Sequence, residues 1–343
     1  MRFKLKILFL WSGCLWLCIL LSGCSDFLSL CSSGLFPSEN LTIYKINIDG
    51  TNKIQLTNKS KTSSNPIFSS NGNKIAFDNR YKLLADKDFD SDINIIDANG
   101  SNFQIIVSSS YKEYSPQFSP DNSKIAYIKD MTSLAIINLN TNATTNIVNS
   151  LGYIKIFQWS PDGTKIIFDA DIAIENVYHE NYSIYSVNSD GLNLVKLTDG
   201  CYPKWSPDGS KIAFQAVSGG IFTMGSTGEN IVQLSTTGKH PEWSADNSKI
   251  LYDNETTTCN YIEYINISNS SKTMLAEGTS KEYSLSGDGF PKWSPDNSKI
   301  LFTKDTIKIM VMDVNSRSVV ELIKGRSPQW APDGTQIVFY SEE

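Results

Sequence analysis

Histidine is nearly absent from this chain, since only His179 and His240 occur among 343 residues. A zinc site usually needs three or four converging ligands, so a histidine-built metal centre is not expected. Both histidines are interpreted as solvent-exposed loop residues. Common catalytic patterns are missing too: there is no His-Glu-x-x-His, no glycine-rich phosphate loop, and Gly225-Ser226-Thr227-Gly228 lacks the spacing of a nucleophile elbow. These absences predict a protein that is not an enzyme.

Long apolar runs are scarce as well. The run Ile7–Leu21 has 15 residues, whereas a membrane-spanning helix needs about 20. Three basic residues precede it, as in a signal peptide. The run ends in Leu21-Ser22-Gly23-Cys24, which resembles the lipobox of bacterial lipoproteins. The resemblance implies a signal peptide over 1–23, lipidation of Cys24 and a tether over 24–40. An uncleaved anchor and an ordinary signal peptide remain alternatives.

Basic residues are outnumbered by acidic ones. The whole chain carries 30 Lys+Arg against 36 Asp+Glu. Loss of residues 1–23 removes three basic residues and no acidic one, which lowers the net charge from −6 to −9. A negative chain without a basic cluster is a poor nucleic-acid binder. It should also be repelled by anionic lipid surfaces, so membrane residence is expected to come from the lipid at Cys24.

Cysteines do not form an obvious disulfide framework. Of the six, Cys14 and Cys18 belong to the predicted signal peptide and Cys24 carries the lipid. Cys31, Cys201 and Cys259 remain, an odd number that leaves at least one thiol unpaired. Cys201 and Cys259 either pair across neighbouring repeats or remain separate thiols.

One segment recurs along the chain, and its fullest copy is Tyr202–Phe214 (YPKWSPDGSKIAF). Seven copies align on an aromatic anchor, with a spacing close to the 40–45 residues of a four-stranded propeller blade. Because the anchors recur once per repeat at a fixed strand position, we expect them to pack in the core and not to form a ligand cage. The anchors are Phe68, Phe118, Trp159, Trp205, Trp243, Trp293 and Trp330.

Each copy contains a tight turn, Ser-Pro-Asp-Gly in its fullest form. The turn carboxylates are Asp121, Asp162, Asp208, Asp246, Asp296 and Asp333, and the first copy has Asn71-Gly72 instead. Only Gly or Asn follows the Asp, and these residues tolerate positive φ best. The next strand alternates polar and apolar residues, so each motif is predicted to be a β-hairpin.

A second strand pair follows each hairpin, which predicts four strands per repeat. The chain begins with an outer pair, Leu41–Thr57, and ends with a hairpin, Pro328–Tyr340. Together these ends complete one blade. The sequence therefore predicts an all-β, seven-bladed β-propeller over 41–343, whose four-stranded antiparallel blades are closed by N- and C-terminal strands that share a blade.

An acidic run lies between the first hairpin and its outer pair. Asp86, Asp88, Asp90 and Asp92 alternate along the chain, a spacing that suits a hard cation such as Ca²⁺. The run departs from an EF-hand loop, which would have Gly at Ser91 and Glu at Asp97. A solvated loop is the alternative. No other cofactor is expected.

The repeats resemble those of the TolB-like propeller family, which is related by pattern to WD-type propellers. The resemblance covers residues 41–340 and implies the fold more firmly than a function. TolB carries a small α/β domain before its propeller and has six blades, so a Tol-system role is in doubt here. Propeller-bearing peptidases add a hydrolase domain that this chain lacks.

We expect a monomeric lipoprotein of the bacterial cell envelope, on its periplasmic or extracellular side, whose propeller binds a protein or peptide of the envelope. The alternative is a carbohydrate-binding or polymer-degrading propeller, lyase- or hydrolase-like, with a site built from loops. The longest connections, 78–92, 169–181, 253–260 and 276–289, are the expected binding elements.

Overall fold

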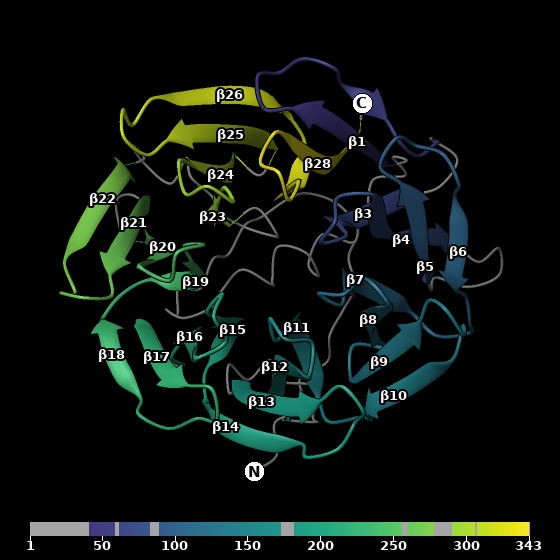
Figure 1. The fold of residues 1–343 in the computed structure, drawn as a ribbon, viewed down its shortest axis with the longest axis horizontal. Coiled ribbons are helices and arrows are strands. Elements are labelled where there is room, and N and C mark those ends of the chain that lie inside the picture. The colour runs from purple at the N-terminus through teal and green to yellow at the C-terminus, as the bar shows by residue number, and fades with distance from the viewer. Residues whose placement is uncertain are drawn as a thin grey trace, which may run out of the picture.

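Seven sheets stand around a central axis in the computed structural model (Figure 1). The structure describes residues 41–58, 62–82, 89–172, 182–255, 260–277, 290–305 and 307–342. Each sheet has four antiparallel strands, and no helix occurs in these ranges. The predicted all-β, seven-bladed propeller is confirmed. The predicted signal peptide, Cys24 and the predicted tether lie outside the described residues.

The blades follow one another along the chain, and each runs from an innermost to an outermost strand. Blades 1 to 3 are β3 (Thr62–Phe68), β4 (Lys74–Lys82), β5 (Phe89–Asp97) and β6 (Gln104–Val107); β7 (Glu113–Phe118), β8 (Lys124–Lys129), β9 (Ser133–Asn138) and β10 (Thr144–Val148); β11 (Tyr153–Trp159), β12 (Lys165–Asp171), β13 (Tyr182–Asn188) and β14 (Val195–Asp199).

Blades 4 to 6 repeat this order. They are β15 (Cys201–Trp205), β16 (Lys211–Gln215), β17 (Ile221–Gly225) and β18 (Val232–Ser235); β19 (Lys239–Trp243), β20 (Lys249–Glu255), β21 (Asn260–Asn266) and β22 (Lys272–Glu277); β23 (Lys292–Trp293), β24 (Lys299–Lys304), β25 (Lys308–Asp313) and β26 (Val319–Lys324).

Blade 7 joins the two ends of the described chain. Its strands are β27 (Arg326–Trp330), β28 (Gln336–Ser341), β1 (Thr42–Asn47) and β2 (Ile54–Gln55). β1 pairs antiparallel with β28 from Thr42↔Ser341 to Asn47↔Gln336. This closure is the one predicted from the unpaired strands at the two ends of the repeat array, and it turns an open row of sheets into a ring.

The core lies between neighbouring blades. Alternate residues of a strand point to opposite faces of its sheet. In β24, Phe302 packs with Leu251 of blade 5, whereas Leu301 packs with Phe339 of blade 7. Every blade therefore contributes apolar side chains to two interfaces.

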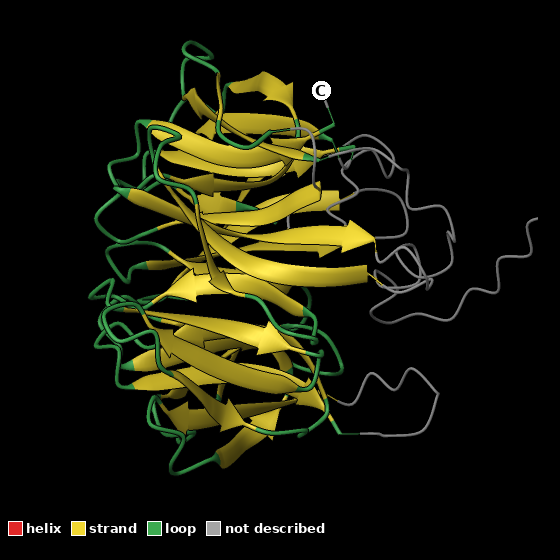
Figure 2. Cartoon of the chain, turned by 90° about the vertical axis from the view of Figure 1, so that its right-hand side faces the viewer, coloured by secondary structure: helices red, strands yellow, loops and turns green. Residues whose placement is uncertain are grey.

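The outermost strands are the exposed edges of the sheets. Six of them, all but the two-residue β2, show a register shift against the neighbouring strand. Such bulges discourage edge-to-edge pairing between molecules. Figure 2 shows the strands running between two faces of a disc. We name the face that carries the seven hairpin turns the turn face, and the opposite one, where the innermost strands begin, the entry face.

Within the described ranges, no helix has the length and apolar character needed to cross a bilayer.

Candidate functional site

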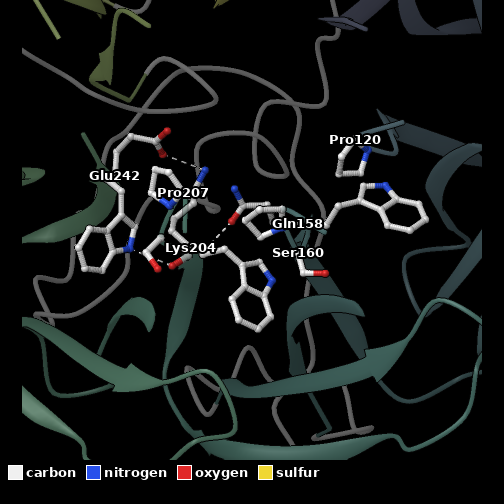
Figure 3. A pocket seen from close by; sticks show the side chains of 11 residues that line it. Pro120, Gln158, Ser160, Lys204, Pro207 and Glu242 are labelled. Carbon is white, nitrogen blue, oxygen red and sulfur yellow. Dashed lines mark hydrogen bonds and ion pairs between the residues drawn. The ribbon is translucent and has the colours of Figure 1, made fainter. Parts of the chain in front are cut away.

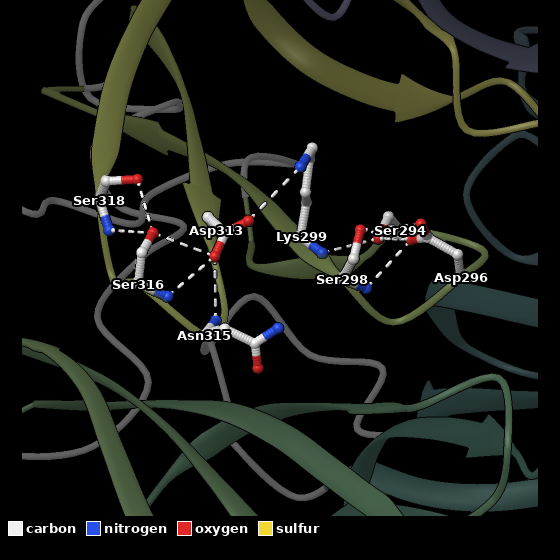
Figure 4. Close-up of polar contacts among 8 residues, drawn as sticks. All are labelled: Ser294, Asp296, Ser298, Lys299, Asp313, Asn315, Ser316 and Ser318. Carbon is white, nitrogen blue, oxygen red and sulfur yellow. Dashed lines mark hydrogen bonds and ion pairs between the residues drawn. The ribbon is translucent and has the colours of Figure 1, made fainter.

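The seven hairpin turns of the turn face are held by their own side chains. In blade 4, Ser206 Oγ donates to Asp208 at 2.7 Å, and Asp208 accepts the N–H of Ser210 at 3.0 Å. Figure 4 shows the equivalent bonds in blade 6, from Ser294 and Ser298 to Asp296. The serine hydroxyl bonds lower the pKa of this carboxyl to about 2. The turn carboxylates therefore have a structural role.

The residue after each of the six turn carboxylates, and the one after Asn71 in the first copy, has positive φ. The angle is 60° at all three asparagines, Asn122, Asn247 and Asn297, and between 70° and 72° at the four glycines, Gly72, Gly163, Gly209 and Gly334. The left-handed conformation predicted from the Gly-or-Asn alternation is confirmed in all seven copies.

The aromatic anchors lie in the interfaces between blades. All but Trp330, which is partly buried, are buried in apolar clusters. The indole N–H of Trp159, Trp243 and Trp330 donates to a carbonyl of the preceding blade. Trp205 and Trp293 differ, because their buried N–H groups have no hydrogen-bond partner among the described residues. The anchors thus serve packing first, and three of them add a bond between blades.

In blades 2 to 4 the residue before the anchor reaches toward the next blade. Gln117 donates to the carbonyl of Phe157 at 2.7 Å, and Gln158 accepts the N–H of Trp205 at 2.8 Å. Lys204 and Glu242 continue the series as an ion pair of 3.1 Å, each about 30% exposed. These partly exposed side chains form a polar belt on the innermost strands. Sequence inspection missed the belt, because only the ring closure brings these positions together.

A cavity of about 210 Å³ opens where this belt meets the turn face of blades 2 to 5 (Figure 3). It combines aromatic edges, proline rings and the Lys204–Glu242 pair, and its volume is below the 300–1,000 Å³ typical of small-molecule pockets. The lining residues are Pro120, Gln158, Trp159, Ser160, Pro161, Lys204, Trp205, Ser206, Pro207, Glu242 and Trp243.

The entry face holds His240, and its placement corrects an expectation. His240 was expected in an exposed loop, but it lies in β19 and is 5% exposed. Its Nδ1 is 2.7 Å from Asp253 Oδ1, and its ring stacks on Phe290 with centroids 3.5 Å apart. The register shift after Lys239, with φ of 52° at His240, turns the ring inward. His179 lies outside the described residues.

Buried carboxylates hold the irregular starts of the innermost strands. Asp169 is fully buried and accepts the N–H of Ile156 at 2.9 Å and that of Tyr202, in the next blade, at 2.8 Å. Asp78 binds Ser64, Asn65 and the N–H of Ser115 in the same manner. Burial raises the pKa of both carboxyls.

The structure describes two of the four aspartates of the acidic run. Asp90 and Asp92 lie on β5, where Asp92 is buried and Asp90 accepts the N–H of Ser91 at 2.9 Å. Asp86 and Asp88 lie outside the described residues. In the part of the chain that is described, no three His, Cys, Asp or Glu side chains converge to hold a metal. The Ca²⁺ site stays a prediction.

Glu113 is a neighbouring group that sequence inspection missed. It is 1% exposed, Ser109 donates to its Oε1, and its Oε2 has no hydrogen-bond partner in the described part of the chain. Burial, together with the charges of Asp90 and Asp92, raises its pKa to about 7. Cys201 is a buried residue of β15, and Cys259 lies outside the described residues, so the pairing of these two stays open.

Solved structures share this fold at low sequence identity. An oligogalacturonate lyase in complex with manganese has a TM-score of 0.68 and 15% identity, covering 88% of this chain and 96% of that one. A putative TolB from Agrobacterium tumefaciens has 0.55 and 16%, covering 89% and 98%. TolB from Acinetobacter baumannii has 0.52 and 18%, covering 93% and 68%. These likenesses bear on the fold alone.

No curated protein matches the chain. The family model of the TolB β-propeller domain matches residues 80–290, more than half of the sequence. Together with the seven repeats and their closure, this match shows that the chain belongs to the TolB β-propeller domain family.

Proposed function

We propose that this protein is a non-catalytic lipoprotein of the bacterial cell envelope whose propeller binds an envelope protein or peptide. The observation that carries the proposal is the cavity at the turn face, lined by three tryptophans, three prolines and the Lys204–Glu242 pair. The tryptophans themselves are packed between blades, so the groups that a partner can reach most fully are the partly exposed Lys204 and Glu242.

The dimensions of this cavity favour a peptide segment. A volume of about 210 Å³ accommodates one or two side chains. The partly exposed ion pair at its edge offers one charge of each sign to the backbone or side chains of an extended segment. Its walls combine residues of the innermost strands with prolines and serines of the hairpin turns, and Gln158 is fixed by its hydrogen bond to Trp205 of the next blade, so little ordering entropy is lost on binding.

Site-specific photo-crosslinking in the native envelope tests this proposal. A photoreactive residue at Gln158 or Glu242 should capture one envelope protein. The matched control is Val320 on the outer strand β26, which is 61% exposed and distant from the cavity. Capture of the same protein from both positions, or of none from the cavity, would refute binding at this surface.

The proposed anchoring is tested separately. Metabolic labelling with a radioactive fatty acid should label the wild-type chain and leave Cys24→Ala unlabelled. Equal labelling of the two chains would contradict lipidation at Cys24.

A second candidate function is action on an acidic polysaccharide. The His240–Asp253 pair favours it, because a carboxylate that orients one ring nitrogen prepares the other to act as a base. The likeness to an oligogalacturonate lyase supports testing that substrate class first. Incubation with oligogalacturonate and manganese should then produce unsaturated sugars, detected by ultraviolet absorbance, and Asp253→Asn should abolish them. No product from the wild-type protein would refute this alternative.

A further inference from the structure

The chain enters the propeller through strand β1, and it does so at the entry face. Thr42, the first residue of β1, pairs with Ser341 of β28 at this face, and Asn47 pairs with Gln336 at the turn-face end. Strand β1 therefore runs from one face of the disc to the other, like the strands in Figure 2. A pull on the chain before Thr42, directed away from the entry face, acts along the axis of β1.

Hydrogen bonds hold β1 along both of its edges. Six residue pairs join it to β28, and the bond from the N–H of Ile48 to the carbonyl of Thr335, at 3.0 Å, extends this ladder. On the other edge, the carbonyl of Ile43 accepts the N–H of Leu56 at 2.8 Å, and the N–H of Ile43 donates to Thr57 Oγ1 at 3.0 Å. Ladder bonds in an antiparallel pair lie perpendicular to the strands. A pull along β1 therefore loads these bonds together, in shear.

The side chains of β1 fasten it to both neighbouring blades. Ile43 is fully buried in a cluster that includes Phe77 of blade 1. Tyr44 and Ile46 belong to a second cluster, which includes Leu301 of blade 6. Withdrawal of β1 along its axis would therefore disrupt two interfaces between blades in addition to the hydrogen bonds.

A pull between the two ends of the described chain acts in a different way. Ser341 is opposite Thr42, so both ends of blade 7 lie at the entry face. A force that separates these two residues acts across the ladder between β1 and β28, and the pairs break one after another. The closing blade is therefore expected to resist tension along its strands better than tension between its two ends.

We propose that β1 is a mechanical clamp, which passes force between the membrane anchor and a partner at the turn face without opening the ring of blades. This inference rests on the proposed function, in which the lipid is on Cys24, before β1, and the partner occupies the turn-face cavity. Because the two attachments are on opposite faces of the disc, tension between the membrane and the partner runs along the strands. The protein then serves as a link that withstands this tension.

Single-molecule pulling in two geometries tests the clamp. The mature chain carries one handle at Cys24, in place of the lipid. The second handle is attached either at Leu192, which is 63% exposed at the turn face of blade 3, or after the last residue of the chain. At the same loading rate, the first unfolding event should need about twofold or more force with the Leu192 handle, because that geometry shears β1 and the other unzips it. Equal forces, or a lower force with the Leu192 handle, would overturn the proposal.

Two matched variants separate the clamp from overall stability. Ile43 of β1 and Ile93 of β5 occupy equivalent positions in the third strands of blades 7 and 1, and both are 0% exposed. Ile43→Val and Ile93→Val should weaken resistance to urea to similar extents. Under force on the Leu192 handle, Ile43→Val should rupture about threefold faster than Ile93→Val. Equal rates would attribute the resistance to overall stability and refute the clamp.

The pulling experiment is independent of the proposed function, because the handles replace both the lipid and the partner. An unlabelled Cys24 in the fatty-acid experiment would remove the proposed anchor. Equal rupture forces in the two geometries would remove the clamp itself.

Discussion

The backbone N–H of Ala245 in blade 5 donates a hydrogen bond of 2.7 Å to Oδ1 of Asn297 in blade 6. Two other pairs of neighbouring hairpin turns are joined in this way. Asn122 accepts from Ser70 at 2.7 Å, and Asn247 accepts from Asp208 at 3.1 Å. Elsewhere a glycine lies under a proline ring, and these pairs are Pro120–Gly163, Pro161–Gly209, Pro295–Gly334 and Pro332–Gly72.

The residue types of neighbouring turns are therefore linked. Proline has no N–H to offer to an asparagine of the next turn, so that turn mostly carries glycine, the other residue type that tolerates positive φ. Where Ser70 or Ala245 replaces proline, the next turn carries asparagine. The exception is the turn that contains Pro207, because the next turn carries Asn247. The side chain of Asn247 accepts the N–H of Asp208, the residue after the proline.

A double-mutant cycle on Ala245 and Asn297 tests this linkage. Asn297→Gly should lower the free energy of unfolding by about 1 kcal/mol, because a hydrogen bond between blades is lost. Adding Ala245→Pro recreates the Pro–Gly arrangement and should recover about 0.5 kcal/mol or more beyond the sum of the single effects. Urea denaturation measures all four proteins. Additive single effects would refute the linkage.

Two tryptophan anchors form a matched pair. Trp243 Nε1 donates to the carbonyl of Lys204 at 3.1 Å, whereas Trp205 Nε1 has no hydrogen-bond partner within the described ranges. Both lose similar packing when changed to phenylalanine. Trp243→Phe should therefore cost about 1 kcal/mol more than Trp205→Phe, measured by chemical denaturation. Equal losses would show that the indole bond adds nothing to stability.

Glu113 should make stability depend on pH. Its pKa is about 7 in the folded protein, above its ordinary value of 4.5. The folded state holds this proton more tightly, so the contribution is complete below about pH 4.5 and is lost as pH rises through 7. Glu113→Gln should stabilise the protein by about 2 kcal/mol at pH 8 and have little effect at pH 5.

Melting curves at several pH values measure this difference. Glu342→Gln, at an exposed position, is the control and should change stability by less than about 0.5 kcal/mol at either pH. A gain from Glu113→Gln that is the same at pH 5 and pH 8 would mean that Glu113 does not titrate between them.

Gly238 precedes β19 and permits close packing. A Cβ there would lie 2.4 Å from Tyr252 Cδ2, and its φ is 108°. Gly238→Ala should destabilise the protein by about 2–4 kcal/mol, because both strain and overlap result. Gly219 has φ of 87° but nothing within 4 Å of its Cβ, so Gly219→Ala isolates the strain and should cost about 1 kcal/mol. Thermal unfolding compares the two, and similar losses would exclude a steric role for Tyr252.

The sequence by itself determined the number of blades, the shared closing blade and the left-handed turn position. Each of these depends on local chemistry repeated seven times. An aromatic anchor, an Asp and a Gly or Asn stand at fixed offsets within one hairpin, and the unpaired strands at the two ends of the repeat array can satisfy their hydrogen bonds only with each other.

Only the tertiary structure decided which distant residues meet. Closure of the ring brings Lys204 to Glu242, and a register shift turns His240 inward onto Phe290. A bulge after Ile309 places Lys324 opposite Lys308. A register counted from the turn between β25 and β26 that ignores this bulge would not pair Lys324 with Lys308. One inserted residue reverses which face a side chain occupies, and its position depends on packing between blades that no single repeat contains.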